Sequence, residues 1–155
     1  MKSAKTIAIN GIIAALYIAL TLISPFSFGV VNIRLSDVIP AIGCIDKRYR
    51  WGVTVGMILA NLFSPYGLVD VCVAVLICFC AFFLGGQKVE VRAVILIFAT
   101  ATFVSLELSV VEKIPFLWIF IEMLISETLL TVLGLTFFRK IEKTYKKSVD
   151  EEKIL

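Results

Sequence analysis

FLWIFIEMLISETLLTVLGLTFF, residues 116–138, is the stretch of sequence that decides the fold. Glu122 and Glu127 are its only charged side chains. The stretch exceeds the roughly 20 residues that an α-helix needs to cross about 30 Å of hydrocarbon, so it predicts a membrane-spanning helix. The whole chain shares this character, because 60% of its 155 residues are hydrophobic and 17% are charged, against about 45–50% and 25% in soluble domains. We predict an all-α integral membrane protein.

Five more apolar stretches lie upstream and predict a six-transmembrane-helix bundle that forms a single membrane domain over residues 1–155. The predicted spans are approximately residues 6–24, 35–47, 51–64, 68–86, 91–108 and 115–138. Pro25 ends the first span, because proline lacks a backbone donor. The second stretch is short, and both full and partial spanning are open for it. Residues 139–155 are charged and predict a cytoplasmic tail that begins as a short helix.

The basic residues predict the orientation of the bundle. Six spans place both termini on one side, and cytoplasmic loops carry an excess of Lys and Arg. With cytoplasmic termini, Arg34 and Lys113 are the only basic residues of the 15 that fall outside. The inner ones are Lys2, Lys5, Lys47, Arg48, Arg50, Lys88, Arg92, Arg139, Lys140, Lys143, Lys146, Lys147 and Lys153. We therefore predict a multi-pass membrane protein, surrounded by lipid, with both termini in the cytoplasm.

The residues that most enzymes and metal sites need are missing or scattered. The chain has no histidine, and its four cysteines show no CxxC spacing, so we expect no metal, cofactor or catalytic residue. It also lacks the GxxxxGK[ST] loop that binds ATP phosphates. No nucleic-acid partner is expected. A membrane protein that binds a ligand but has no ATP-binding loop of its own is expected to act as one subunit of a larger assembly.

Carboxylates within the apolar spans predict a ligand site. Glu122 and Glu127 lie about 9 and 17 Å below the outer surface if the sixth span starts near residue 116, and each must there be protonated, paired or exposed to a wet cavity. A purely structural ion-pair network is the alternative. Arg34 and Asp37, three residues apart, could pair on one helix face. Our candidate substrate-binding residues are Arg34, Asp37, Asn61, Asp70, Glu107, Trp118, Glu122 and Glu127.

The first span carries a strip of small residues. Gly11, Ala15 and Ala19 recur at four-residue spacing and therefore lie on one face of a helix. Such strips allow two helices to approach closely. The strip predicts either packing inside the bundle or a docking face for a partner membrane protein.

The segment from Val31 to Asp70 resembles the QueT family, the substrate-binding S-components of energy-coupling factor (ECF) transporters. The resemblance rests on I-R-x-S-acid at 33–37, on a basic residue followed by glycine at 48–52 and on G-x-x-x-A-N-L-x-S-P-x-G-L-x-D at 56–70. The stretch INGIIAALY, residues 9–17, is similar too. Beyond Val71 the resemblance rests on hydropathy, length and topology.

The resemblance implies a protein of the bacterial plasma membrane, and it implies a function. It implies an outward-facing pocket for a queuosine precursor, which is a 7-deazaguanine base, and a first helix that docks through Ala15 and Ala19 on a transmembrane coupling protein. Two ATPases would supply the energy. Carboxylates suit such a base, because they accept paired hydrogen bonds from N–H donors and attract an ammonium group.

Other functions compete with this one. An S-component for another vitamin or small amine would share the architecture and differ in the pocket. A proton-coupled small-molecule exporter could use Glu127 as its coupling group. A membrane-embedded enzyme is disfavoured, because the chain offers scattered carboxylates and no histidine. We predict a transport subunit that is not an enzyme.

Overall fold

The computed structural model describes residues 2–24 and 34–152, with side chains described for residues 4–24 and 34–144. These residues form helices and connecting turns, without a β-strand in the described part of the chain. The elements are α1 (Lys2–Ile23), η1 (Leu35–Val38), α2 (Pro40–Ile45), η2 (Lys47–Tyr49), α3 (Arg50–Asn61), α4 (Leu68–Phe79), η3 (Cys80–Leu84), α5 (Val89–Val111) and α6 (Phe116–Glu152). Here η1 and η2 are 3-10 helices, and η3 is a π-helix that extends α4.

Three helices are long and apolar enough to cross a membrane. They cover residues 4–23 in α1, 89–111 in α5 and 116–144 in α6, and they agree with the first, fifth and sixth predicted spans. The apolar helical stretches 35–45 and 68–84 are shorter, and α3 has only 12 residues. The chain is a helical membrane protein, and the count of six full spans and the cytoplasmic termini stay predictions.

Two predicted elements differ from the structure. The stretch predicted as one helix over 35–47 is a 3-10 turn, η1, followed by the six-residue α2 with Pro40 at its start. The cause is tertiary, because the buried side chains of Ser36 and Asp37 hydrogen-bond to α1. The charged tail is not a separate short helix, because α6 continues through residue 138 and ends at Glu152. Lys and Arg are good helix formers, which lets the helix extend past the apolar part.

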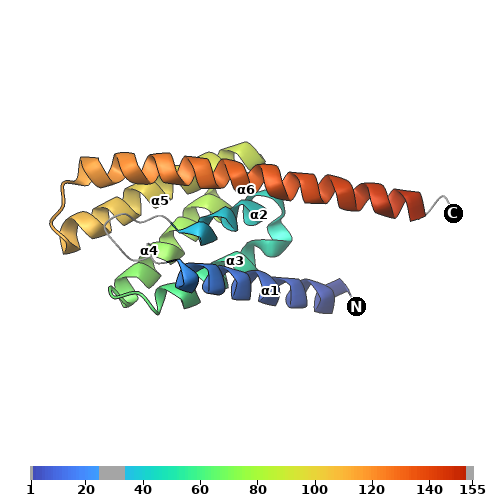
Figure 1. Cartoon of the computed structure of the whole chain (residues 1–155), viewed down its shortest axis with the longest axis horizontal. Helices are drawn as coiled ribbons and strands as arrows, with labels where there is room; N and C mark the ends of the chain where they lie inside the picture. Colours follow the sequence, from blue (N-terminus) through green and yellow to red (C-terminus); the bar gives the residue numbers. More distant parts are fainter. Residues whose placement is uncertain (1, 25–33, 153–155) are drawn as a thin grey trace.

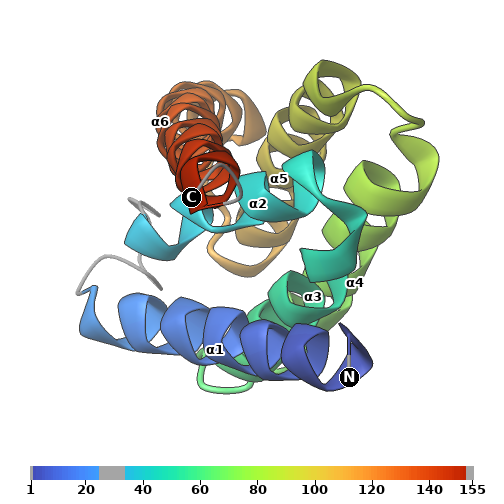
Figure 2. The same ribbon diagram turned by 90° about the vertical axis from the view of Figure 1, so that its right-hand side faces the viewer.

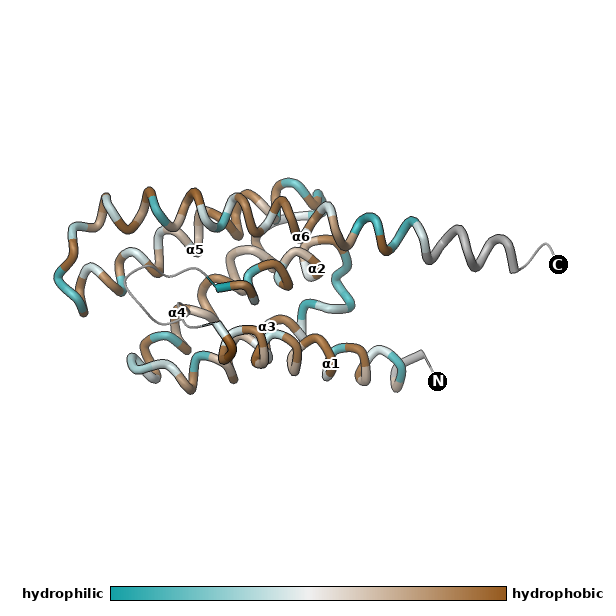
Figure 3. Tube along the Cα trace, in the orientation of Figure 1, coloured by the Kyte–Doolittle hydropathy of each residue, from teal (hydrophilic) through white to brown (hydrophobic). Residues whose placement is uncertain are grey.

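The helices form a bundle in which α2 lies inside (Figure 2). α1 packs on α3, α3 on α4, α4 on α5 and α5 on α6, while α2 contacts α3, α5 and α6. The start of α1 and the end of α6 lie at the same end of the molecule (Figure 1). Apolar residues predominate along the helices, and hydrophilic ones gather at the loops and on the projecting part of α6 (Figure 3). Many large apolar side chains of these helices are exposed. This arrangement suits a surface that faces lipid along its length.

Gly134 lets α6 lie directly against η1 and α2. A Cβ at this position would sit 2.3 Å from the Val38 carbonyl oxygen and 2.8 Å from the Ala41 Cβ. The Val38 oxygen is a backbone atom, so it cannot move away by a change of side-chain rotamer. The contact between α6 and the η1–α2 segment therefore requires glycine here.

We expect Gly134→Ala to lower the free energy of unfolding by about 2 kcal/mol, because overpacking a closely packed contact costs roughly 1–3 kcal/mol. Thermal unfolding in detergent, followed by circular dichroism, measures the change. Gly11→Ala is the matched control, because Gly11 has no neighbour within 4 Å of an added Cβ. Alanine in a helix is favoured over glycine by about 1 kcal/mol. Equal unfolding midpoints for the two variants would contradict the close contact at Gly134.

Arg92 joins the end of α2 to the start of α5. Its guanidinium is buried and donates from Nε to the Cys44 carbonyl oxygen at 2.8 Å. It also donates to the carbonyl oxygens of Gly86 and Gln87, at 3.0 and 3.1 Å. Nearby, Arg50 donates to the carbonyl oxygens of Gly43 and Phe82. These cations satisfy carbonyls that helix ends leave unpaired, and they oppose the negative end of the helix dipole.

We expect Arg92→Gln to lower the free energy of unfolding by about 2–4 kcal/mol, because hydrogen bonds to a charged donor contribute about 1.5–3 kcal/mol each and buried carbonyls would lose their partner. The unfolding midpoint in detergent measures this. Arg48→Gln is the control, because Arg48 is exposed and pairs with Asp46 at the surface, where such pairs contribute little. A midpoint for Arg92→Gln that equals that of Arg48→Gln would show that the buried guanidinium does not hold α2.

Candidate functional site

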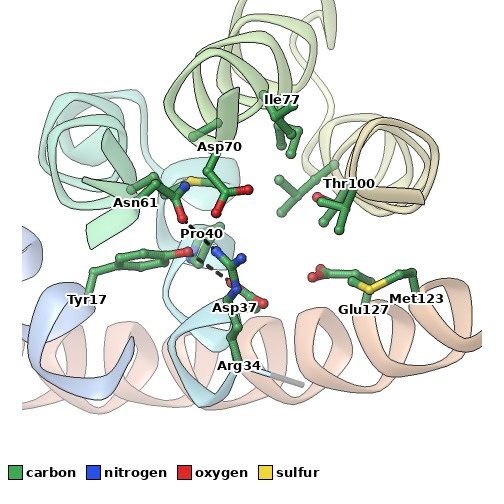
Figure 4. Close-up of a pocket in the computed structure, with 15 residues that line it drawn as sticks. Tyr17, Arg34, Asp37, Pro40, Asn61, Asp70, Ile77, Thr100, Met123 and Glu127 are labelled. Carbon is green, nitrogen blue, oxygen red and sulfur yellow. Dashed lines mark hydrogen bonds between the residues drawn. The ribbon is translucent and has the colours of Figure 1, made fainter. Parts of the chain in front are cut away.

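A polar cavity lies between the helices where η1 and α2 meet α1, α3, α4, α5 and α6 (Figure 4). Its volume is about 30 Å³, which is room for one or two water molecules. The polar side chains that line it are Tyr17, Arg34, Asp37, Asn61, Asp70, Thr100 and Glu127. Pro40, Met57, Ile77 and Met123 are among the apolar ones. Polar groups from six segments of the chain thus converge on one small buried space.

Two hydrogen bonds tie the η1 side of the cavity to α1. The Tyr17 hydroxyl donates to Asp37 Oδ1 at 3.0 Å. One turn further along α1, Thr21 Oγ1 and Ser36 Oγ lie 2.8 Å apart, and Thr21 also donates to the Tyr17 carbonyl oxygen. All four side chains are buried. The bonds hold the Asp37 carboxyl toward the cavity and leave its second oxygen for other contacts.

Arg34 brings a positive charge to the cavity. It is buried, and its Nη1 donates to Asn61 Oδ1 at 2.7 Å. The predicted pairing of Arg34 with Asp37 on one helix face is wrong in its geometry, because Arg34 precedes η1 in an extended conformation, with φ −107° and ψ 115°. The two charges still interact across the cavity. This bond gives the buried Asn61 side chain, at the end of α3, a hydrogen-bonding partner.

Asp70 and Glu107 lie together on the α4 and α5 side. Asp70 is in the first turn of α4, where the helix dipole favours an acid, but Gly67 is the N-cap residue and no side chain caps the helix. Asp70 Oδ2 is buried and has no hydrogen-bonding partner among the described residues, and the same holds for both Glu107 carboxyl oxygens. The two carboxyl groups lie close enough to share a hydrogen bond once one of them is protonated, and Glu107 also interacts with Arg34. Unpaired buried acceptors of this kind are suited to a ligand that carries donors.

Glu127 is the most deeply buried acid of the cavity, with 2% of its surface exposed. It projects from the middle of α6 toward Asp37 and interacts with that carboxyl and with Arg34. Glu122, which lies five residues earlier, is half-buried and does not line the cavity. Five residues turn a helix by about 140°, which explains why only one of the two glutamates faces this space.

The comparisons with known proteins identify the family. A family model described as QueT transporter matches residues 7–143. The chain belongs to the QueT transporter family. This confirms the resemblance seen in the sequence and extends it over the second half of the chain.

A curated relative gives this family its context. The chain is 36% identical over 78 residues to the queuosine precursor transporter QueT of Lactococcus lactis subsp. cremoris (strain MG1363). The alignment covers 47% of this chain and 46% of the relative, so the match spans about half the length of each. No solved structure matches the chain. Family membership and the three long apolar helices together make this a membrane protein of a transporter family.

The predicted site residues of this QueT-family chain have different positions. Arg34, Asp37, Asn61, Asp70 and Glu127 line the one cavity. Glu107 interacts with Asp70 but is not among the residues that line the cavity. Glu122 and Trp118 do not line it, and Trp118 is 73% exposed on the surface of α6. The structure therefore brings five of the predicted residues together, and it gives Trp118 the position of a residue at the surface of the bundle.

Sequence reasoning missed two polar residues of the cavity. Among the described residues, Tyr17 is the aromatic side chain that lines it, and Thr100 contributes a hydroxyl from α5. Trp118, the aromatic residue among the predicted site residues, is exposed. The sequence offered one indication of Tyr17 and Thr100, which is that each is a polar residue within an apolar span. Neither Tyr nor Thr is costly enough in a membrane helix to stand out from the sequence.

The loop between α3 and α4 is fastened to the end of α5. The Tyr66 hydroxyl donates to Glu112 Oε1 at 2.8 Å. Partial burial and this bond raise the pKa of Tyr66 to about 12, so the phenol stays protonated and keeps donating throughout the physiological range. Tyr66 thus positions the loop and does not reach the cavity.

The small-residue strip of α1 faces away from the bundle. Gly11, Ala15 and Ala19 are exposed, while Ala14 and Tyr17 face inward. Of the two alternatives left open by the sequence, packing of the strip inside this bundle is wrong. The strip is free to meet lipid or another membrane helix.

Proposed function

We propose that this chain is the substrate-binding membrane subunit of an ECF-type transporter that imports a queuosine precursor, a 7-deazaguanine base, into a bacterial cell. Membership in the QueT transporter family supports the transport role. The single structural observation that carries the proposal is the convergence of Asp37, Asp70, Glu127 and Arg34 on one buried cavity. The chain would bind the base, and other subunits would supply the energy.

The cavity offers the chemistry that such a base requires. The pyrimidine edge of a 7-deazaguanine has a ring N–H and an amino group, which one carboxylate can accept as a pair. Its carbonyl oxygen needs a donor, and Arg34 is the cation of the cavity. An aminomethyl arm carries a positive charge, which a second carboxylate can accept. Asp70, with Oδ2 unpaired, and Glu127 are the carboxylates that we assign to these two tasks.

The cavity, with the helices placed as they are in this structure, is too small for a bicyclic base. A volume of about 30 Å³ holds water only, so binding requires the lining helices to separate. The contact of η1 with α6 is the one that must yield, because Asp37 and Glu127 meet across it. Binding is therefore coupled to a rearrangement of the η1–α2 segment.

The strip on α1 is the proposed docking face for the transmembrane coupling protein. Gly11, Ala15 and Ala19 present a smooth exposed surface, and small residues allow the close approach that association of helices in lipid depends on. The coupling protein and two ATPases would complete the transporter.

Transport by reconstituted proteoliposomes tests the proposal. The chain alone, and the chain together with a coupling protein and two ATPases, are supplied with radiolabelled 7-aminomethyl-7-deazaguanine. We expect ATP-dependent uptake by the complete assembly and none by the chain alone. Transport by the chain alone, driven by a pH gradient, would instead support a proton-coupled exporter, for which the buried Glu127 is the feature in favour. Uptake of a vitamin but not of the deazaguanine would support an S-component for another ligand.

A further inference from the structure

The buried charges around the cavity are unequal in number. Among the described residues, the buried acidic side chains are Asp37, Asp70, Glu107 and Glu127, and all four lie at or beside the cavity. The buried basic side chains are Arg34 and Arg92. Arg92 is near the opposite end of α5, where it binds backbone carbonyls. Four carboxyl groups therefore share one nearby guanidinium.

These carboxyl groups cannot all be ionised in the empty cavity. An unpaired carboxylate is strongly disfavoured away from water, and like charges side by side disfavour each other further. Asp37 faces Glu127, and Asp70 faces Glu107. Arg34 can compensate about one negative charge. The empty site must therefore hold protons.

Within residues 4–24 and 34–144, whose side chains are described, we find no further cation at the cavity to compensate for the remaining charge. The ionisable side chain that α1 turns toward the cavity is Tyr17, which donates its hydrogen to Asp37. The α2 and α3 segments contribute Pro40 and Asn61, which do not ionise. The polar side chain that α5 contributes to the lining is Thr100, which does not ionise. The carboxylates must therefore be neutralised by bound protons or by a cationic ligand.

We propose that the cavity takes up a cationic ligand in exchange for a proton, so that binding converts a carboxylic acid of the Asp37–Glu127 pair into a carboxylate and releases its proton to water. This rests on the proposed function and specifies the charge of its ligand. The incoming ammonium replaces the proton as the neutralising charge. Affinity therefore rises with pH, by about tenfold per pH unit for each proton released, because protons compete with the cation.

Titration calorimetry of the purified chain in detergent tests the exchange. Binding of 7-aminomethyl-7-deazaguanine is measured from pH 5.5 to 8.5 in buffers of different ionisation enthalpy, which gives the number of protons released. The 7-hydroxymethyl analogue is the matched neutral ligand, because it has the same size and no charge. We expect the amine to release about one proton and the alcohol to release none. The amine should also gain affinity with pH, whereas the alcohol should not.

A variant identifies the group that loses the proton. Glu127→Gln should reduce the release on binding of the amine, while Glu90→Gln, an exposed residue of α5, should leave it unchanged. Tight binding of the amine with no proton release and no dependence on pH would overturn the exchange and leave the proposed function intact. If neither deazaguanine binds to the folded protein, the proposed ligand fails, and the exchange fails with it.

Discussion

Glu127→Gln is expected to weaken the binding of 7-aminomethyl-7-deazaguanine by roughly 100-fold. Glu127 is almost completely buried and lines the cavity beside Asp37. Replacing a buried carboxylate by an amide of nearly the same shape removes a charge-assisted contact, which contributes about 1.5–3 kcal/mol, and each 1.4 kcal/mol is a factor of ten in affinity. Equilibrium dialysis with the radiolabelled base, in detergent, measures the change.

The control for this variant is Glu122→Gln. Glu122 lies on the same helix but does not line the cavity, so we expect its variant to bind within about threefold of the unaltered chain. The two variants carry the same chemical change, five residues apart. If Glu122→Gln weakened binding as much as Glu127→Gln, the effect would be one of general charge or folding, and the cavity would not be the binding site.

Ala15→Trp is expected to reduce uptake strongly while ligand binding stays within about twofold. Ala15 is exposed on the outward face of α1, and the small residues Gly11 and Ala19 flank it one turn away on each side. An indole there prevents the close approach of another helix, whereas the cavity lies on the inner face, where Tyr17 points. ATP-dependent uptake by the assembled transporter should fall at least tenfold.

Val94→Trp makes the comparison specific to the strip. Val94 is an exposed residue of α5, which lies across the bundle from α1 (Figure 2), and we expect this variant to transport normally. Co-purification of the coupling protein with each variant gives a second readout. Full uptake by Ala15→Trp would place the docking face elsewhere on the bundle.

Hydropathy was sufficient to predict the long helices and insufficient for the short ones. The stretch 116–138 is apolar apart from two glutamates and a few hydroxyl side chains, so its helix was predictable from composition, as were those near residues 6–24 and 91–108. The break of 35–47 into η1 and α2 was not, because it follows from bonds that Ser36 and Asp37 make with α1, far away in the sequence. Contacts between residues so far apart in the sequence cannot be predicted from local hydropathy.

The cost of burying charge in a membrane was the most useful guide to the site. It singled out Arg34, Asp37, Asp70 and Glu127, which the fold brings together. It could not separate Glu127 from Glu122, because the rotation of α6 depends on its packing against η1 at Gly134. The distribution of basic residues predicted only a cytoplasmic position for Arg92. In the structure this side chain is buried and donates hydrogen bonds to backbone carbonyls.

The most direct test of the account is equilibrium binding of radiolabelled 7-aminomethyl-7-deazaguanine to the purified chain in detergent, without coupling protein, ATPases or ATP. The account predicts saturable binding at one site per chain, with a dissociation constant below about 1 µM, which corresponds to more than about 8 kcal/mol. Circular dichroism confirms that the sample is helical. Absence of saturable binding by helical protein would contradict the central claim that this cavity is a site for a queuosine precursor.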